Sequence, residues 1–207
     1  MSDIYSAMEK AIGTKPAEVA THLATHRMVP IEGKITKEMA DGVIRVLIAL
    51  DLKEDKPITL IISSSGGDVH SGNKIGGMIK TFRSPVDGLV VGSACSMAVD
   101  ILLMCRRRRM LRHAEIFVHF TRCGFDAVRD SDDITDSDMD AIRRKMTVDK
   151  KKREELYMTR LKKTREEVHD LFRIGEKYDT CYTAEEALKL GFVDEIDDDF
   201  KFFPTTT

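Results

Sequence analysis

The segment GSACSM, residues 92–97, holds three candidate nucleophiles, Ser93, Cys95 and Ser96, between two apolar runs. Ser93 can cap a helix, and Cys95 can fill space as a small apolar residue. Ser96 lies where a helix is expected to begin, so the helix dipole would stand behind its hydroxyl and the N–H of Met97 would point at the same spot. These features suit a nucleophile, although a capping or packing role for Ser96 explains the spacing as well.

A nucleophilic serine needs a base within hydrogen-bond distance. Among the six histidines, His119 ends the apolar run EIFVH, and such a histidine can reach into a cleft while its backbone is held rigid. A structural role for His119 is the alternative. His22 and His26 lie four residues apart on an expected helix, but with no third ligand evident the sequence predicts no metal site. The aspartate that would orient the base cannot be selected by pattern, because the chain contains many.

The turn in SSSGGDVHSGNK lies between an apolar run and a helical pattern. Its lysine falls one position late for GxxxxGK, and GxGxxG is absent, so the pattern argues against a nucleotide-binding loop. Successive glycine N–H groups at a helix N-terminus can face an anion, and the oxyanion of acyl transfer is such an anion. A plain strand-to-helix turn is the alternative interpretation.

Alternating strand and helix patterns must position these segments. Apolar runs typical of buried strands occur at 27–33, 57–63, 86–91 and 114–120, and amphipathic helical patterns at 37–52, 69–82 and 95–105. This alternation indicates an α/β fold. Gly72 and Gly76 lie four residues apart, so their helix is expected to pack closely against a neighbour.

The second half of the chain has a different composition. Residues 126–140 are rich in Asp and lack Glu, which predicts a mobile acidic loop, and a long charged helix is expected at about 137–163. Two capping boxes, a short strand and a flexible tail complete the pattern: Thr164 with Glu167, Thr183 with Glu186, FVDEI and residues 198–207. The four arginines at 106–109 favour a solvated helix end or intersubunit ion pairs over nucleic-acid binding.

Composition narrows the class of protein. The 33 basic and 35 acidic side chains give a net charge of −2, which argues against broad electrostatic binding to nucleic acid. The four cysteines form no CxxC pair and follow no apolar signal, and no apolar run approaches the roughly 20 residues of a membrane span. We therefore expect a soluble, cytoplasmic protein without membrane association. Residues 1–26 are expected to form a helical segment, in which Pro16 suits a first helical turn.

Four segments resemble, in order, motifs of the family of Clp protease proteolytic subunits (ClpP). ISSSGGDVHSG is similar to the family's INSPGG turn, VVGSACSM to its GxAASM nucleophile segment, EIFVHF to its xVMIHQP strand, and YDTCYTAEEALKLGFVDEI to its RDxFxSAxEAxxYGLVD close. The resemblance runs from about Arg27 to Ile196. Each motif alone is modest, but four in the family's order and at near-family spacing form a specific signal.

The resemblance implies roles for particular residues. Ser96 aligns with the family's nucleophile, His119 with its general base and Asp179 with the acid that orients the base. The N–H groups of Gly67 and Met97 align with its oxyanion hole. Asp179 rests on resemblance alone, whereas the other assignments also follow from the residues themselves. No metal or organic cofactor is implied.

The resemblance also implies a ClpP/crotonase-like fold, a spiral of βαβ units with a protruding helical handle. The handle would comprise about 125–165, and the head 27–124 and 166–197. Family members assemble into heptameric rings, which stack through their handles into tetradecamers and receive unfolded polypeptides from an AAA+ unfoldase. The implied function is that of a serine endopeptidase that cleaves unfolded proteins inside an oligomeric chamber.

Departures from the family pattern indicate a divergent member, such as a phage-encoded copy. Ser65 replaces a proline, Phe120–Thr121 replaces Gln-Pro, and the segment from His119 to Asp179 is longer and acidic. The N-terminus looks helical and lacks the family's axial hairpin pattern, which leaves the unfoldase partner open. The alternative functions on this scaffold are a capsid-maturation protease, a crotonase-type acyl-CoA enzyme and an inactive structural subunit.

Overall fold

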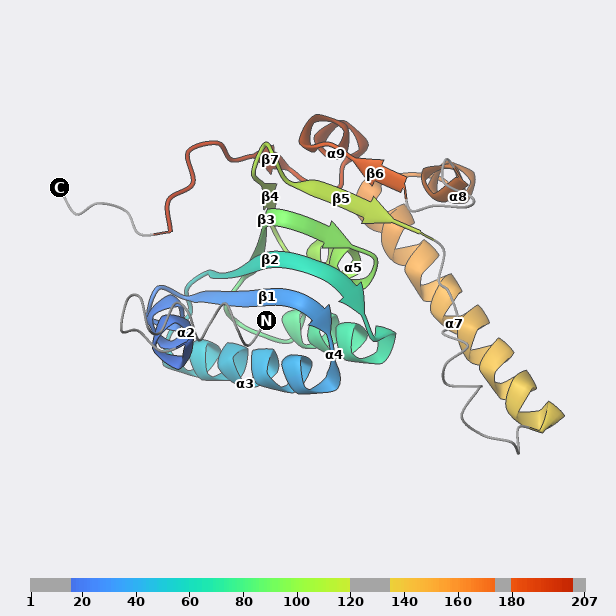
Figure 1. The fold of residues 1–207 in the computed structure, drawn as a ribbon, viewed down its shortest axis with the longest axis horizontal. Coiled ribbons are helices and arrows are strands. Elements are labelled where there is room, and N and C mark those ends of the chain that lie inside the picture. The colour runs from blue at the N-terminus through green and yellow to red at the C-terminus, as the bar shows by residue number, and fades with distance from the viewer. Residues whose placement is uncertain (1–15, 120–134, 174–179, 203–207) are drawn as a thin grey trace.

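The computed structural model describes residues 16–119, 135–173 and 180–202 of the 207-residue chain, and Figure 1 shows their arrangement. The helices are α2 (Pro16–Thr25), α3 (Lys37–Lys53), α4 (Val69–Ile79), α5 (Met97–Met104), α7 (Asp136–Leu161), α8 (Arg165–Arg173) and α9 (Ala184–Leu190). The strands are β1 (Met28–Ile35), β2 (Ile58–Gly67), β3 (Val86–Cys95), β4 (Arg108–Met110), β5 (Glu115–Val118), β6 (Thr180–Tyr182) and β7 (Glu195–Ile196). Strands and helices alternate from β1 to β4, which confirms the predicted α/β class.

One sheet holds these strands, in the order β1-β2-β3-β4-β7, with β5 and β6 off this path. All pairs along the path are parallel, and a helix connects each strand to the next from β1 to β4, as expected for βαβ units. Strand β3 has two neighbours on the edge away from β2. Its residues 88–90 pair with β4 and its residues 93–95 with β5. The sheet therefore divides between residues 90 and 93 of β3, a few residues before Ser96.

Helix α3 shows how the sequence pattern becomes packing. Thr36 caps it, since the Thr36 hydroxyl oxygen accepts a hydrogen bond from the N–H of Met39 at 3.2 Å. Its buried side chains recur at helical spacing: Ala40, Val43, Ile44, Leu47 and Leu50. This face packs against β1 and α4, so α3 covers the sheet beside α4 (Figure 1).

Helix α4 also lies against α5, and its glycines explain how closely. A Cβ added at Gly72 would collide with the side chain of Met97, and one added at Gly76 would collide with that of Met104. Close packing through these two glycines was predicted, and it is confirmed. The N-terminal ends of α4 and α5 are thereby held near one another.

Several strands differ from the sequence prediction. Strand β1 continues to Ile35 past an irregularity after Gly33, β2 continues four residues beyond the predicted end at 63 to Gly67, and β3 continues through GSAC to Cys95. Strands β4 and β6, of three residues each, were not predicted. Such short strands carry too few residues to show an alternating pattern, so their pairing partners define them.

The arginines at 106–109 run from just after α5 into β4, which begins at Arg108, and each contacts an acidic side chain of the same chain. The ion pairs are Arg106–Asp87, Arg107–Glu195, Arg108–Asp194 and Arg109–Asp197, and Arg112 adds contacts to Glu185 and Asp198. We refer to these pairs as the arginine ladder. The sequence predicts a solvated helix end or intersubunit ion pairs here. Arg106 and Arg107 do follow the end of α5 and are about half exposed, but Arg108 and Arg109 are largely buried in ion pairs within the chain. The parallel pairing of β4 with β7 brings these two arginines beside acids about 86 positions away.

Helix α7 projects beyond the sheet (Figure 1). Its first half is largely exposed, whereas its second half packs against α5 and α8 and buries Tyr157 and Leu161. The protruding helix agrees with the predicted handle. The limits of the handle at 125 and 165 stay a prediction, since most of the acidic loop lies outside the described residues, as do 1–15 and the end of the tail.

Several helix ends in the rest of the chain lie where their capping residues predicted them. Thr183 and Glu186 form a capping box at the start of α9, and Gly191 ends that helix with a positive φ of 85°. The same reciprocal bonds join Thr164 and Glu167. Pro16 lies in the first turn of α2. Across the ranges that the structure describes, no helix is both long and apolar enough to cross a membrane.

Candidate active site

The turn from β3 into α5 holds Ser96 in a strained conformation. Its φ of 51° and ψ of −117° place it in a region that residues with a side chain rarely adopt. Its N–H donates a 2.8 Å hydrogen bond to the carbonyl oxygen of Phe117 on β5, and its own carbonyl accepts from the N–H of Val99 at 3.0 Å. Its hydroxyl makes no capping bond to the helix. A sharp strand-to-helix turn of this kind presents a nucleophile at the end of a sheet.

The glycine turn at the end of β2 lies against the Ser96 turn. Gly66 has a φ of 79°, and a Cβ there would come within 2.5 Å of the carbonyl oxygen of Cys95 and 2.9 Å of the Cβ of Ser96. Gly67 has a φ of 151°, and a Cβ there would collide with the backbone of Ile35. Both positions therefore require glycine, because two backbone segments approach too closely for a side chain.

Hydrogen bonds from Ser64 support this turn. The Ser64 hydroxyl donates to the carbonyl of Gly33 at 2.6 Å and accepts from the N–H of Gly66 at 3.1 Å. Ser65, which stands where the family motif has proline, is exposed and lines the cleft described next. The turn is thus fixed by Ser64 and by strand pairing, without the ring of a proline.

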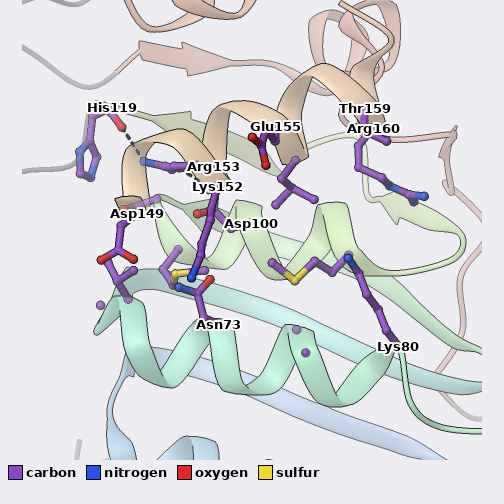
Figure 2. Close-up of a pocket in the computed structure, with 18 of the residues that line it drawn as sticks. Asn73, Lys80, Asp100, His119, Asp149, Lys152, Arg153, Glu155, Thr159 and Arg160 are labelled. Carbon is purple, nitrogen blue, oxygen red and sulfur yellow. Dashed lines mark hydrogen bonds and ion pairs between the residues drawn. The ribbon is translucent and has the colours of Figure 1, made fainter. Parts of the chain in front are cut away.

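A cleft of about 650 Å³ lies between α7 and the helices α4 and α5 (Figure 2). Four of the five predicted site residues line it: Gly67, Ser96, Met97 and His119. All six histidines are among the described residues, and His119 is the one that lines this cleft. The fifth predicted residue, Asp179, lies outside the described residues.

Strand pairing explains why His119 lies beside Ser96. Cys95 is opposite Phe117 in the parallel pair of β3 and β5, and the Ser96 N–H continues this ladder. His119 follows two residues after Phe117, immediately beyond the last residue of β5. The carbonyl oxygen of His119 accepts a 2.9 Å hydrogen bond from Nη1 of Arg153, and its imidazole is directed away from that guanidinium (Figure 2).

The wall formed by α7 is strongly charged, which the sequence analysis did not anticipate. Its cleft-lining residues include Asp149, Lys152, Arg153, Glu155 and Arg160. Figure 2 shows Asp149 and Lys152 directed from α7 toward α4, whose Asn73 faces them. Helix α7 carries charges on all sides, so no periodic signal marks which of them face the cleft.

Arg153 and Asp100, which both line the cleft, form a largely buried ion pair. Nε of Arg153 donates to Oδ1 of Asp100 at 2.9 Å, and the Tyr157 hydroxyl donates to the same oxygen at 2.9 Å. Burial disfavours the charged guanidinium, but Asp100 and Tyr157 together outweigh this effect, so the pKa of Arg153 is raised. Burial also raises the pKa of Tyr157 well above its ordinary value. Arg153 is therefore held as a cation and Tyr157 as a neutral donor.

Sequence reasoning missed this ion pair, although one signal was available. Asp100 is a lone carboxylate inside the apolar run AVDILLM, and a buried carboxylate requires a partner. The side chains of Asp100 and Arg153 are only 8% and 12% exposed. Among the described residues, no three histidine, cysteine or acidic side chains gather in a way that would hold a metal ion.

Comparison with known proteins adds an independent observation. A family model described as Clp protease matches residues 12–199. The chain belongs to the Clp protease family. The predicted resemblance to this family is thereby confirmed, and the match covers nearly the whole chain.

The chain has low sequence identity to curated members of the Clp protease family. The chain is 29% identical to the "ATP-dependent Clp protease proteolytic subunit" of Streptococcus mutans over 187 residues, covering 89% of this chain and 91% of that protein. It is 30% identical to "ATP-dependent Clp protease proteolytic subunit 2" of Treponema pallidum over 123 residues, covering 58% and 62%. The subunit from Lactococcus lactis is 26% identical over 187 residues, covering 89% of each chain. Family and relatives together support a hydrolase, a protease of the ClpP type.

Proposed function

We propose that the protein is a serine endopeptidase in which Ser96 is the nucleophile, His119 the general base and Asp179 the residue that orients His119. The observation that carries the proposal is the strained Ser96 turn, which opens into the same cleft as His119. Strain at one residue persists only where the surrounding structure enforces it, and such strain clusters at active sites. The β3–β5 pairing and the glycine turn supply that enforcement.

The proposed reaction is acyl transfer to serine followed by hydrolysis. His119 accepts the hydroxyl proton as Oγ of Ser96 attacks a peptide carbonyl, and it then gives that proton to the leaving amine. A water molecule, deprotonated by His119, attacks the acyl-enzyme. The acyl–Oγ bond then breaks, His119 returns its proton to Oγ of Ser96, and the second product leaves as the acid. A base beside a serine is needed because the hydroxyl alone is a weak nucleophile at neutral pH.

Backbone amides would stabilise the tetrahedral intermediate. Met97 is the first residue of α5, so its N–H has no partner within the helix, and it lines the cleft with Gly67. The helix dipole adds a favourable field for an oxyanion at this end. We propose the N–H groups of Gly67 and Met97 as the oxyanion donors.

Two observations support Asp179 as the orienting acid: its resemblance to the family motif and the position of Thr180, the residue that follows it. Thr180 pairs with Val118 in the antiparallel pair of β5 and β6, and Val118 is the residue before His119. The chain therefore enters β6 beside the strand end that carries the proposed base. This placement supports Asp179 as the orienting acid.

The finer biological setting is also proposed. The relatives' names describe proteolytic subunits of ATP-dependent Clp proteases. We propose, by similarity, that this chain forms a homo-oligomeric chamber of heptameric rings, receives unfolded polypeptides and works with an AAA+ unfoldase.

A serine-directed fluorophosphonate tests the proposed nucleophile. The wild-type protein should be labelled at Ser96, identified by peptide mapping, and should hydrolyse an unfolded protein substrate. Ser96→Ala should lose labelling and reduce hydrolysis by about 10³-fold or more, while its native mass and circular dichroism stay unchanged. Ser93→Ala is the matched control, since Ser93 lies on β3 three residues away and should keep both activities. Labelling of Ser96→Ala at the wild-type rate would refute the assignment.

A further inference from the structure

One guanidinium, that of Arg153 on α7, contacts both segments that carry the proposed catalytic pair. Its Nη1 donates to the carbonyl oxygen of His119 at 2.9 Å, and its Nε donates to Oδ1 of Asp100 at 2.9 Å. Its Nη2 donates to the hydroxyl of Tyr157 at 3.3 Å, one turn further along α7. All three nitrogens of the guanidinium are therefore engaged.

Asp100 connects this guanidinium to Ser96. It lies in the first turn of α5, four residues after Ser96, and its backbone N–H approaches the Ser96 carbonyl oxygen at 3.4 Å. His119, on the other side, follows the end of β5. Arg153 thus joins the helix that begins after the nucleophile to the strand end that carries the base.

Aromatic rings hold the guanidinium in this position. The Arg153 guanidinium carbon lies 5.4 Å from the ring centroid of Tyr157 and 5.4 Å from that of Phe172 on α8. The two rings are themselves 5.2 Å apart. A cation over aromatic faces in a buried setting has little freedom to move, so the three hydrogen bonds keep their directions.

From this geometry we propose that Arg153 is a positioning residue, which fixes the backbone of His119 relative to the Ser96 turn. The inference rests on the proposed function, because it gives the Ser96–His119 pair its alignment. Arg153 acts through the His119 carbonyl and the Asp100 carboxylate, without taking part in proton transfer.

Only arginine can make these contacts together. A guanidinium presents donors in a planar fork, whereas the ammonium of lysine is a single point of charge. Lysine at position 153 would keep the attraction to Asp100 but could not also reach the His119 carbonyl in the arginine geometry. Arg153→Lys therefore removes the link to His119 while leaving no buried carboxylate without a cation.

The main experiment measures the rate of fluorophosphonate labelling at Ser96 and the steady-state hydrolysis of a short peptide ester, with active sites counted from the labelling end point. We expect Arg153→Lys to reach the wild-type end point but to label about 10- to 100-fold more slowly, because small displacements of reacting groups have effects of this size. The kcat per titrated site should fall by the same factor, with KM within about two-fold. Arg143→Lys, the same change in the exposed half of α7, is the matched control and should match wild type.

A second variant covers the case in which Arg153→Lys folds poorly. Arg153→Met combined with Asp100→Leu and Tyr157→Phe replaces the whole buried polar cluster by apolar side chains of similar size. Such replacements often preserve or increase stability, because no charge is left buried and unpaired. This variant should fold, as judged by a cooperative thermal transition, and should label as slowly as Arg153→Lys or more slowly.

The outcomes separate this inference from the proposed function. If the wild type is labelled at Ser96 and both Arg153 variants are labelled as fast as the wild type, the positioning role is wrong and the proposed function stands. If KM rises while kcat is unchanged, Arg153 is a substrate contact and the positioning role is again wrong. If the wild type itself is not labelled at Ser96, the proposed function fails and this inference fails with it.

Discussion

Two strand-to-helix turns of the same sheet solve the same structural problem differently. The β2–α4 turn ends in Asp68, whose φ of −64° is ordinary and whose carboxylate accepts a 2.8 Å hydrogen bond from the N–H of Ser71. The β3–α5 turn ends in Ser96, whose φ is 51° and whose hydroxyl caps nothing. Both turns precede helices that pack against each other.

The difference shows that the usual rule of helix capping by a side chain is not followed at the position proposed for catalysis. Asp68 uses its side chain to satisfy the helix that it begins, as capping residues usually do. Ser96 occupies the same position at a conformational cost and leaves its hydroxyl to the cleft. The glycine turn contributes Gly66, which allows the two turns to touch. Three tests of this comparison follow, in order of expected effect.

Gly66→Ala should have the largest effect. A methyl group there would come within 2.5 Å of the Cys95 carbonyl oxygen and 3.1 Å of the Met97 nitrogen, at a φ of 79° that favours glycine. We expect the free energy of unfolding to fall by about 2 kcal/mol or more and labelling of Ser96 to be lost. Gly42→Ala is the control: no atom lies within 4 Å of an added Cβ in α3, so stability should rise by about 0.5–1 kcal/mol. Urea unfolding measures both, and equal effects would contradict the close approach.

Exchanging the two turn residues for smaller ones should change stability in opposite directions. Asp68→Ala removes the cap of α4 and should lower the free energy of unfolding by about 1 kcal/mol. Ser96→Gly removes no capping bond and relieves the positive φ, so it should raise the free energy of unfolding by up to about 1 kcal/mol while abolishing labelling. Thermal and urea unfolding would decide. A loss of stability in Ser96→Gly would show that the turn is not strained.

The smallest effect concerns pH. The hydrogen bond from the Ser71 hydroxyl is the main cause that lowers the pKa of Asp68 in the folded protein. A lowered folded pKa means that this contribution is complete above the unfolded pKa, near 4, and is lost as pH falls through the folded pKa. Asp68→Asn keeps a capping oxygen without the charge, so it should be less stable than wild type by about 0.5 kcal/mol or less at pH 7, and the difference should shrink as pH falls below the unfolded pKa and through the lowered folded pKa. A difference that grows with acidity would contradict the lowered pKa.

Sequence reasoning predicted the parts of the site that depend on local pattern. Ser96, His119 and the glycine turn each follow an apolar run, and parallel strands bring their ends to one edge of a sheet. The close packing of α4 through Gly72 and Gly76 was predicted for the same reason, since four-residue spacing puts both glycines on one face.

What depends on distant contacts could not be predicted. Arg153 lies 53 positions after Asp100, on a helix whose charges follow no period. Strand β4 is defined by its pairing with β7 rather than by its own sequence. The acids that pair with its arginines lie near the other end of the described chain. From the sequence, Asp179 could be proposed only by resemblance to the family motif, because aspartates are too common in this chain for a pattern to select one.

The arginine ladder restricts which amino-acid substitutions the protein can accept during evolution. Partial burial favours the neutral form of Asp194, yet its bonds with Arg108 keep the pKa of that carboxyl below its ordinary value, so the pair stays charged at neutral pH. Losing Asp194 or Asp197 would leave Arg108 or Arg109, which are largely buried, without the acid that each pairs with. Arginine and acid are therefore expected to be gained or lost together among descendants of this protein, despite their separation in the gene.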